Sequence, residues 1–78
     1  MTPRERILGL LTSVAPDIEA SEVIPGIDFR EQFDFDSMDL LSFAIAVSRE
    51  FGIEVPETDY GELASLERCE AYVAAHAK

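Results

Sequence analysis

The sequence has little of what disulfide-stabilised and exported proteins need. Cys69 is the only cysteine, so no disulfide bond can form within the chain. Its place in a segment of helical apolar periodicity favours a small buried hydrophobe over a reactive thiol. Residues 1–5 carry no apolar stretch of the kind that a signal peptide requires. We therefore expect a cytoplasmic location.

Long hydrophobic runs and basic residues are also scarce. No apolar run approaches the roughly 20 residues of a membrane span, so we expect no membrane insertion. Six basic residues stand against sixteen acidic ones, which gives a formal net charge of -10. Such a chain repels nucleic acid and anionic membranes, and it favours protein partners with basic surfaces. The alternative is that the acidity only keeps a small domain in solution.

What is present is enough apolar material for one small core. The chain has 78 residues, of which 47% are hydrophobic, including five phenylalanines. This size is near the lower limit at which one hydrophobic core suffices without staples. We therefore predict a single domain over residues 1–78.

Apolar residues recur at helical spacing in three segments. Thr2 to Glu5 form a capping box with proline at the first helical position, and this first helix should end near Ala15 because Pro16 follows. A second helix is predicted over 37–51, with Gly52 just after its end. Ser65 should cap a last helix that reaches Val73 and extends toward His76.

The connections between these segments are uneven in length. Residues 16–35 form a long first loop whose aromatic residues should pack onto the helices, with Asp28 able to cap one short helical turn. Residues 53–56 form an extended link, and 58–63 a minor helical turn. The predicted fold is all-α, a small four-helix bundle of three major helices and one short helix with a long first loop.

The second helix carries two apolar stripes at about 100° per residue. One is the predicted core stripe, which contains Leu40, Phe43, Ala44, Val47 and Phe51. The other lies on the flank and consists of Met38, Leu41 and Ile45, bordered by Ser42 and Arg49. The flank is either a docking face or the edge of a wide core face.

The stretch 34–41 sets one serine among carboxylates where this helix begins. Asp36 suits the N-cap, and Asp39 three residues later completes a box-like start. Ser37 is then the first helical residue, with its hydroxyl at the rim of the helix and within reach of another protein's active site. This geometry suits covalent modification better than catalysis.

Asp36-Ser37-Met38, at the start of an apolar helix that ends in the residues 50–56, resembles the acyl carrier proteins over nearly the whole chain. In that family the serine of an Asp-Ser-Leu or Asp-Ser-Met motif carries 4'-phosphopantetheine, whose thiol holds an acyl or aminoacyl group as a thioester. The resemblance implies that Ser37 is the carrier residue. The chain departs from the family pattern at one position, because Asp34 stands where the family commonly has glycine.

Further expectations come from the resemblance. The protein would be a monomeric carrier and not an enzyme, serving fatty-acid, polyketide or related acyl metabolism. Its partners would be a phosphopantetheinyl transferase, which uses coenzyme A and a magnesium ion, and acyl-loading and acyl-processing enzymes. They would dock on a set of residues around the serine, namely Asp36, Met38, Asp39, Leu41, Ser42, Ile45 and Arg49. Typical bacterial family members have a more acidic helix here, so we expect a dedicated partner set.

Four other interpretations compete with an acyl carrier. The cargo could be aminoacyl or peptidyl, or the chain could be a helical protein-interaction domain without modification. A hydrolase would need Ser37 with His76, but no Gly-x-Ser-x-Gly elbow is present. A calcium loop counted from Asp34 would place Asp39 and Ile45 where glycine and glutamate are required, so no metal site is expected.

Overall fold

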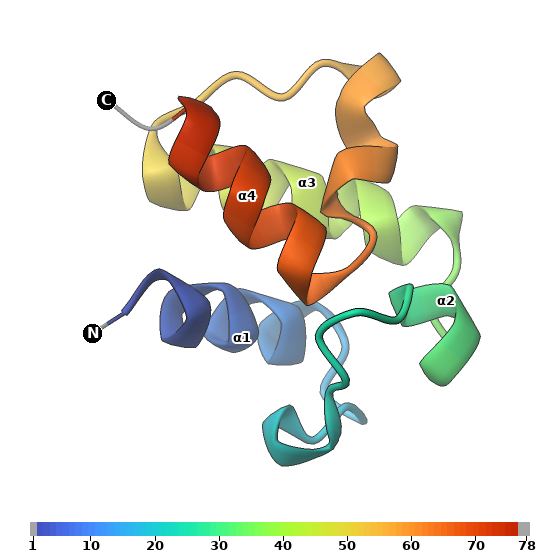
Figure 1. The fold of residues 1–78 in the computed structure, drawn as a ribbon. Coiled ribbons are helices and arrows are strands. Elements are labelled where there is room, and N and C mark those ends of the chain that lie inside the picture. Colours follow the sequence, from blue (N-terminus) through green and yellow to red (C-terminus); the bar gives the residue numbers. More distant parts are fainter. Residues whose placement is uncertain (1, 77–78) are drawn as a thin grey trace.

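A computed structural model, which describes residues 2–76, places three long helices around one core (Figure 1). They are α1 (Pro3–Val14), α3 (Ser37–Phe51) and α4 (Leu66–His76). Three short elements connect them, namely the 3-10 helix η1 (Ala20–Glu22), the one-turn helix α2 (Phe29–Gln32) and the 3-10 helix η2 (Glu57–Leu63). Every regular element within residues 2–76 is helical. The predicted all-α bundle with three major helices is confirmed, and η2 is its short helix.

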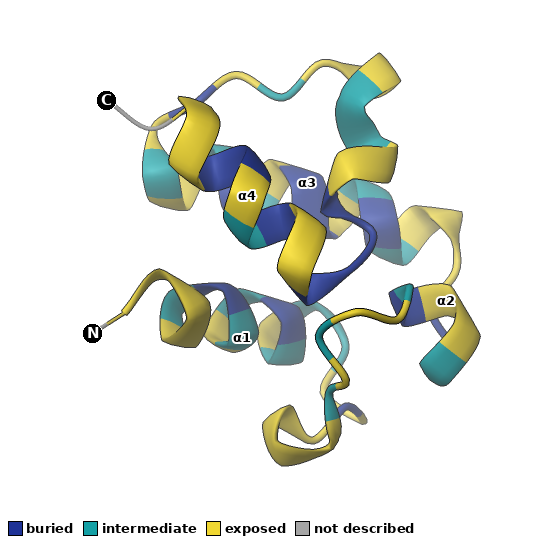
Figure 2. Ribbon diagram, in the orientation of Figure 1, coloured by how far each residue is buried: buried dark blue, intermediate teal, exposed yellow. Residues whose placement is uncertain are grey.

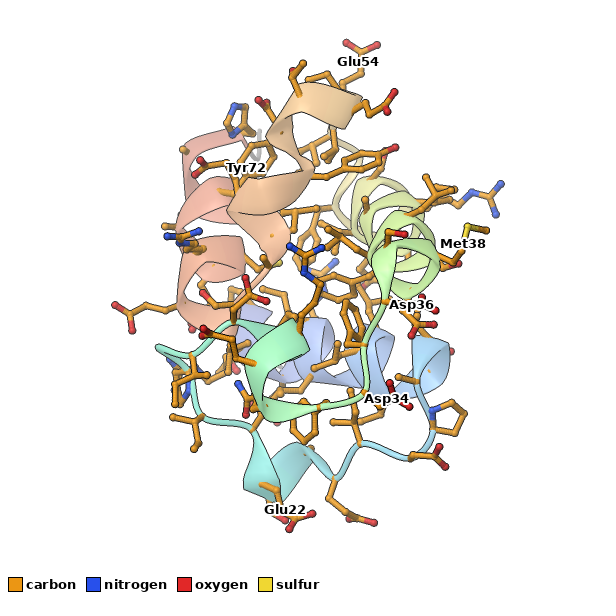
Figure 3. The ribbon with its side chains drawn as sticks, turned by 90° about the vertical axis from the view of Figure 1, so that its right-hand side faces the viewer. Glu22, Asp34, Asp36, Met38, Glu54 and Tyr72 are labelled. Atoms are coloured by element: carbon orange, nitrogen blue, oxygen red, sulfur yellow. The ribbon has the colours of Figure 1, made fainter. Side chains whose placement is uncertain are left out.

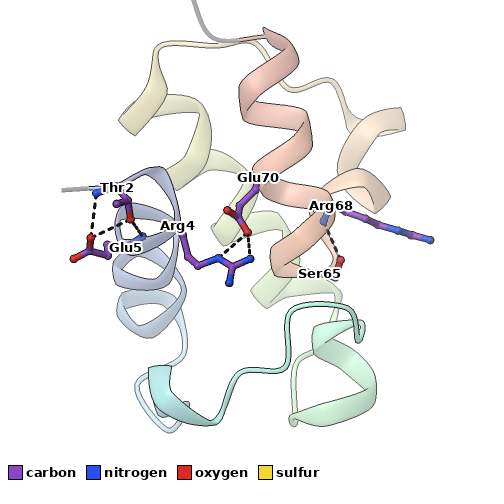
Figure 4. A network of polar contacts seen from close by, with 6 residues as sticks. All are labelled: Thr2, Arg4, Glu5, Ser65, Arg68 and Glu70. Atoms are coloured by element: carbon purple, nitrogen blue, oxygen red, sulfur yellow. Dashed lines mark hydrogen bonds and ion pairs between the residues drawn. The ribbon is translucent and has the colours of Figure 1, made fainter.

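The ends of α1 and α4 follow the predicted capping. The Thr2 hydroxyl accepts a hydrogen bond from the Glu5 amide at 3.1 Å, and the Glu5 carboxylate accepts one from the Thr2 amide at 3.2 Å (Figure 4). The Ser65 hydroxyl accepts one from the Arg68 amide at 3.2 Å, at the start of α4. Helix α1 ends at Val14, one residue before the predicted end. These caps satisfy amides that have no partner inside the helix.

The core lies between the facing sides of α1, α3 and α4 (Figure 2). Its fully buried large side chains are Phe29, Phe43, Ile7, Leu11, Leu63, Leu66, Val47 and Cys69. The buried state predicted for Cys69 is confirmed. Phe51 differs from its predicted core position, because it is only partly buried and its ring lies 4.4 Å from the Arg6 guanidinium. The end of α3 lies at the edge of the core, where Arg6 of α1 covers it.

Side-chain bonds hold the helices at their outer edges. Arg4 of α1 donates to the Glu70 carboxylate of α4 at 2.6 and 2.9 Å (Figure 4). Arg6 donates to the Glu50 carboxylate of α3 at 2.8 Å and to the Glu50 carbonyl at 3.1 Å. The second bond satisfies a carbonyl in the last turn of α3, which has no partner within the helix. Helix α1 is thereby attached to both other long helices.

The long loop between α1 and α3 is fixed by aromatic packing, as predicted. Phe29 of α2 and Phe35 lie with their ring centroids 5.5 Å apart, and each also contacts Phe43 of α3, at 5.7 and 6.4 Å. Such tilted and edge-on pairs stabilise beyond the area that they bury. The predicted cap is also present, since Asp28 accepts a hydrogen bond from the Arg30 amide at 2.8 Å. The loop therefore reaches the start of α3 in a defined conformation.

No helix within residues 2–76 has both the length and the apolar character that crossing a membrane would require.

Candidate attachment site

The first turn of α3 is closed by two reciprocal hydrogen bonds. The Asp36 carboxylate accepts from the Asp39 amide at 2.9 Å, and the Asp39 carboxylate accepts from the Asp36 amide at 3.2 Å. The Leu40 amide donates to the Asp36 carbonyl at 3.0 Å, which is the first bond of the helix. Asp36 has extended backbone dihedrals, as an N-cap requires. The capping box predicted for this turn is confirmed.

Ser37 is the first residue of α3 and is exposed. Within residues 2–76 its hydroxyl makes no hydrogen bond, and neither its amide nor that of Met38 has an acceptor. These two amides lie at the N-terminal end of α3, where the helix dipole is positive. A phosphate ester on the hydroxyl would lie beside free N–H donors, a setting that suits a phosphate. The neighbouring Asp36 and Asp39 carboxylates already accept backbone amides.

Buried neighbours on both sides hold Ser37 in place. Phe35, two residues before it, is 4% exposed and belongs to the phenylalanine cluster. Leu40, three residues after it, is 9% exposed and faces the core. The serine is thus an exposed group on a fixed support, which is a suitable arrangement for an attachment point.

The flank of α3 is part of the surface. Met38 is 66% exposed and Ile45 is 46% exposed, while Leu41 is half-buried. Ser42 and Arg49 are exposed beside them. Figure 3 shows the Met38 side chain directed away from the body of the protein. The structure therefore excludes the wide core face as a description of Met38 and Ile45.

Asp34 stands at a place where glycine is not needed. Among the described residues only Gly52 has a positive φ. Asp34 is exposed, and the Phe35 amide donates to the Phe33 carbonyl at 2.9 Å across it. This tight bend forms without the left-handed conformation that favours glycine. The loop accepts an aspartate there without backbone strain.

His76 is not brought near the serine. It is exposed at the end of α4, where its Nδ1–H donates to the Tyr72 carbonyl at 2.9 Å and its ring stacks on Tyr72 with centroids 4.0 Å apart. It lines a cavity together with Ser48 and Gly52 near the C-terminal end of α3. Ser48 is about 16 Å along the helix axis from Ser37. The serine and histidine of a hydrolase are therefore not assembled.

The acidic residues do not gather into an ion site in the described part of the chain. No three histidine, cysteine, aspartate or glutamate side chains there are grouped closely enough to hold a metal ion.

Sequence reasoning did not foresee η1 or the contacts of Arg4 and Arg6 with distant helices. Nothing in the local pattern signals these contacts.

Comparisons with known proteins show which family the chain resembles. The profile of the family described as "Phosphopantetheine attachment site" matches residues 5–73. The acyl carrier protein of Rubrobacter xylanophilus is 32% identical over 76 residues, which cover 94% of each chain. Acyl carrier protein 2, mitochondrial, of Arabidopsis thaliana is 25% identical over 72 residues, which cover 92% of this chain and 56% of that one.

The fold agrees as well. A solved structure of the acyl carrier protein from Enterococcus faecalis superposes with a TM-score of 0.77 at 22% identity, covering 99% of this chain and all of the other. The chain thus has the fold of that small helical protein. With the match over residues 5–73, the chain belongs to the phosphopantetheine-binding acyl carrier protein family.

Proposed function

We propose that Ser37 carries 4'-phosphopantetheine and that the arm holds an acyl group as a thioester, in fatty-acid, polyketide or related acyl metabolism. The observation that carries this proposal is the exposed Ser37 hydroxyl at the first position of a capped helix, within the matched residues 5–73. When bound, the cofactor supplies the thiol that forms the thioester. Residues 1–78 form one acyl-carrier-like domain.

The protein itself performs no catalysis. Its contribution is to present the Ser37 hydroxyl at a fixed place and then to tether the acyl group, which raises the effective concentration of that group near successive enzymes. A phosphopantetheinyl transferase must supply the groups that activate the hydroxyl, because no base lies in hydrogen-bonding contact with it among residues 2–76. We infer a cytoplasmic monomer that acts through protein partners.

The partners dock on the surface around the serine. Met38 and Ile45 supply exposed apolar area, and Leu41 lies half-buried between them. The polar border of this surface consists of Asp36, Asp39, Ser42 and Arg49. We call the whole surface, apolar centre and polar border together, the α3 strip. A few side chains at the centre of an interface, shielded there from water, contribute most of its binding free energy.

The proposal is tested by measuring the intact mass after incubation with coenzyme A and a broad-specificity transferase. The wild-type chain should gain one phosphopantetheine, and Ser37→Ala should fold and gain none. Ser13→Ala is the matched control, because it removes another exposed hydroxyl, lies on α1 outside the α3 strip and should still be loaded. Circular dichroism checks that each variant is helical. A gain of mass in Ser37→Ala, or mapping of the arm to Ser13, Ser42 or Ser65, would refute the assignment.

A further inference from the structure

The residue that follows the attachment serine presents a sulfur atom to solvent. Met38 is 66% exposed, which is the largest exposure of any large hydrophobic side chain among residues 2–76. It lies one residue beyond Ser37, and Figure 3 shows it directed outward from the first turn of α3. An enzyme that reaches the Ser37 hydroxyl must therefore cover this thioether or pass beside it.

The other sulfur of the described residues is protected from oxidants. Cys69 is 0% exposed, and burial together with the nearby Glu70 charge raises the pKa of its thiol from 9.0 to about 12. Thiols react with peroxide as thiolates, so a buried thiol with this pKa does not react near neutral pH. A peroxide in solution accordingly meets Met38 and not Cys69.

We propose that Met38 is an oxidation site whose sulfoxide slows the use of Ser37 by partner enzymes, an inference that rests on the proposed role of Ser37. The thioether sulfur attacks one peroxide oxygen, the O–O bond breaks, and water is released once the proton is transferred. The sulfur loses two electrons, and the peroxide gains these two electrons. The product is methionine sulfoxide, which sulfoxide reductases convert back to methionine.

The expected effect follows from the position of Met38 in the α3 strip. A sulfoxide is polar, and burying it against a partner without a hydrogen bond has an energetic cost that the apolar thioether does not have. The fold should be unaffected, because Met38 makes no contribution to the buried core. Oxidation would thus act on docking while leaving the helices in place.

The test compares wild type and Met38→Leu before and after treatment with hydrogen peroxide. Leucine keeps an apolar side chain of similar volume but has no sulfur. Peptide mapping locates each added oxygen, including any at Met1, which lies outside the described residues. The loading rate with coenzyme A and transferase is divided by the rate of the same variant before treatment. Wild type should lose about five- to tenfold, as for an interface contact of intermediate weight, and Met38→Leu should keep its rate.

A reductase completes the experiment. Methionine sulfoxide has two epimers, each of which is reduced by its own reductase. Treatment of the oxidised wild type with both reductases should restore the loading rate. Full oxidation of Met38 with an unchanged rate, or an equal loss in Met38→Leu, would overturn the proposal. If the untreated chains are never loaded, the proposed function fails and the effect on loading fails with it. The assignment of Met38 as the reactive sulfur is then judged by the peptide map alone.

Discussion

At the scale of single residues, position distinguishes Ser37 from the other serines. Ser65 is 5% exposed and caps α4 through its hydroxyl, so it is already engaged. The Ser48 hydroxyl donates to the Ile53 carbonyl at 2.6 Å. Ser37 is exposed and lies at the first position of α3, with buried residues close on both sides. Its proposed role comes from this setting, since a serine hydroxyl alone has no special reactivity at neutral pH.

Cys69 gives a prediction on pH dependence. Burial, with a smaller contribution from Glu70, raises its pKa to about 12 in the folded protein. Below pH 9.0 the thiol is protonated in both states, whereas between pH 9.0 and about 12 the unfolded chain releases the proton and the folded one keeps it. The free energy of unfolding should therefore fall as the pH rises, by about 1.4 kcal/mol from this group at pH 10.

The measurement is urea denaturation of wild type and Cys69→Ala at about pH 8 and about pH 10. Alanine lacks the titrating group, so the variant should lose about 1.4 kcal/mol less than wild type over this interval. Other groups that titrate, including Tyr72, whose pKa burial also raises, are common to both chains. An equal loss in the two chains would contradict the prediction.

At the scale of the element, α3 ends as clearly as it begins. Gly52 has φ 66° and ψ 36°, and both its amide and that of Ile53 donate to the Ser48 carbonyl. The left-handed conformation is the reason for glycine here, because the Cβ of an L-residue meets steric strain in it. Gly9, inside α1, is in the opposite situation, since a Cβ there would have no atom within 4 Å.

The two glycines should respond to alanine with opposite signs. Gly52→Ala should lower the free energy of unfolding by about 1–2 kcal/mol, the cost of a left-handed L-residue. Gly9→Ala should raise it by about 0.5–1 kcal/mol, because alanine restricts the unfolded chain and fits the helix. Denaturant titration of both variants beside wild type measures this. Destabilisation by Gly9→Ala as large as that by Gly52→Ala would show that φ is not the cause.

The exposed face of α3 gives a prediction about partners. After Asp36 and Asp39 the α3 strip holds no further carboxylate and includes Arg49, whereas the family resemblance implies basic patches on the enzymes of general fatty acid synthesis. Ile45→Ala should weaken binding to the cognate enzyme by about 1–3 kcal/mol if Ile45 is a hot spot. Arg49→Glu should improve use by a general enzyme, because it replaces a like charge with an opposite one.

The prediction about partners is tested by steady-state kinetics with one general and one cognate enzyme. The proteins compared are wild type, Ile45→Ala and Arg49→Glu. Ser13→Ala, which changes an exposed residue of α1 outside this face, serves as the control. A wild type that is already efficient with the general enzyme, and indifferent to Arg49, would refute the idea of a dedicated partner set.

At the scale of the whole molecule, charge opposes the compact state. Sixteen acidic residues stand against six basic ones, and three of the basic ones, Arg4, Arg6 and Arg30, form ion pairs with Glu70, Glu50 and Asp28. All three pairs are partly exposed, so their screening by salt costs little. The remaining carboxylates repel one another over distances that salt shortens.

Added salt should therefore raise the melting temperature. A series of thermal unfolding curves at low and moderate ionic strength, with sodium chloride as the only variable, measures the effect. The physical reason is that repulsion among exposed charges is screened beyond a Debye length of about 10 Å at 0.1 M salt. Melting temperatures that do not change with ionic strength would contradict the prediction.

The sequence alone determined the features that depend on neighbouring residues. The Asp36–Asp39 box, the first position of Ser37, the bounds of α3 and the left-handed Gly52 were all predicted and are all present. Each rests on hydrogen bonds or dihedral angles within a few residues, so the local pattern contains the necessary information. The identity of the candidate serine follows from these features together with the family motif.

Only the tertiary structure decided which apolar residues of α3 are buried and how the loop is fixed. Helical periodicity could not tell whether Met38 and Ile45 edge the core or face solvent, because the width of the buried face depends on where α1 and η2 pack. The contact of Arg4 with Glu70 joins residues 66 apart, and that of Arg6 with Glu50 joins residues 44 apart. Such contacts form only when the whole chain has folded, since distant segments meet through the shared burial of their apolar faces.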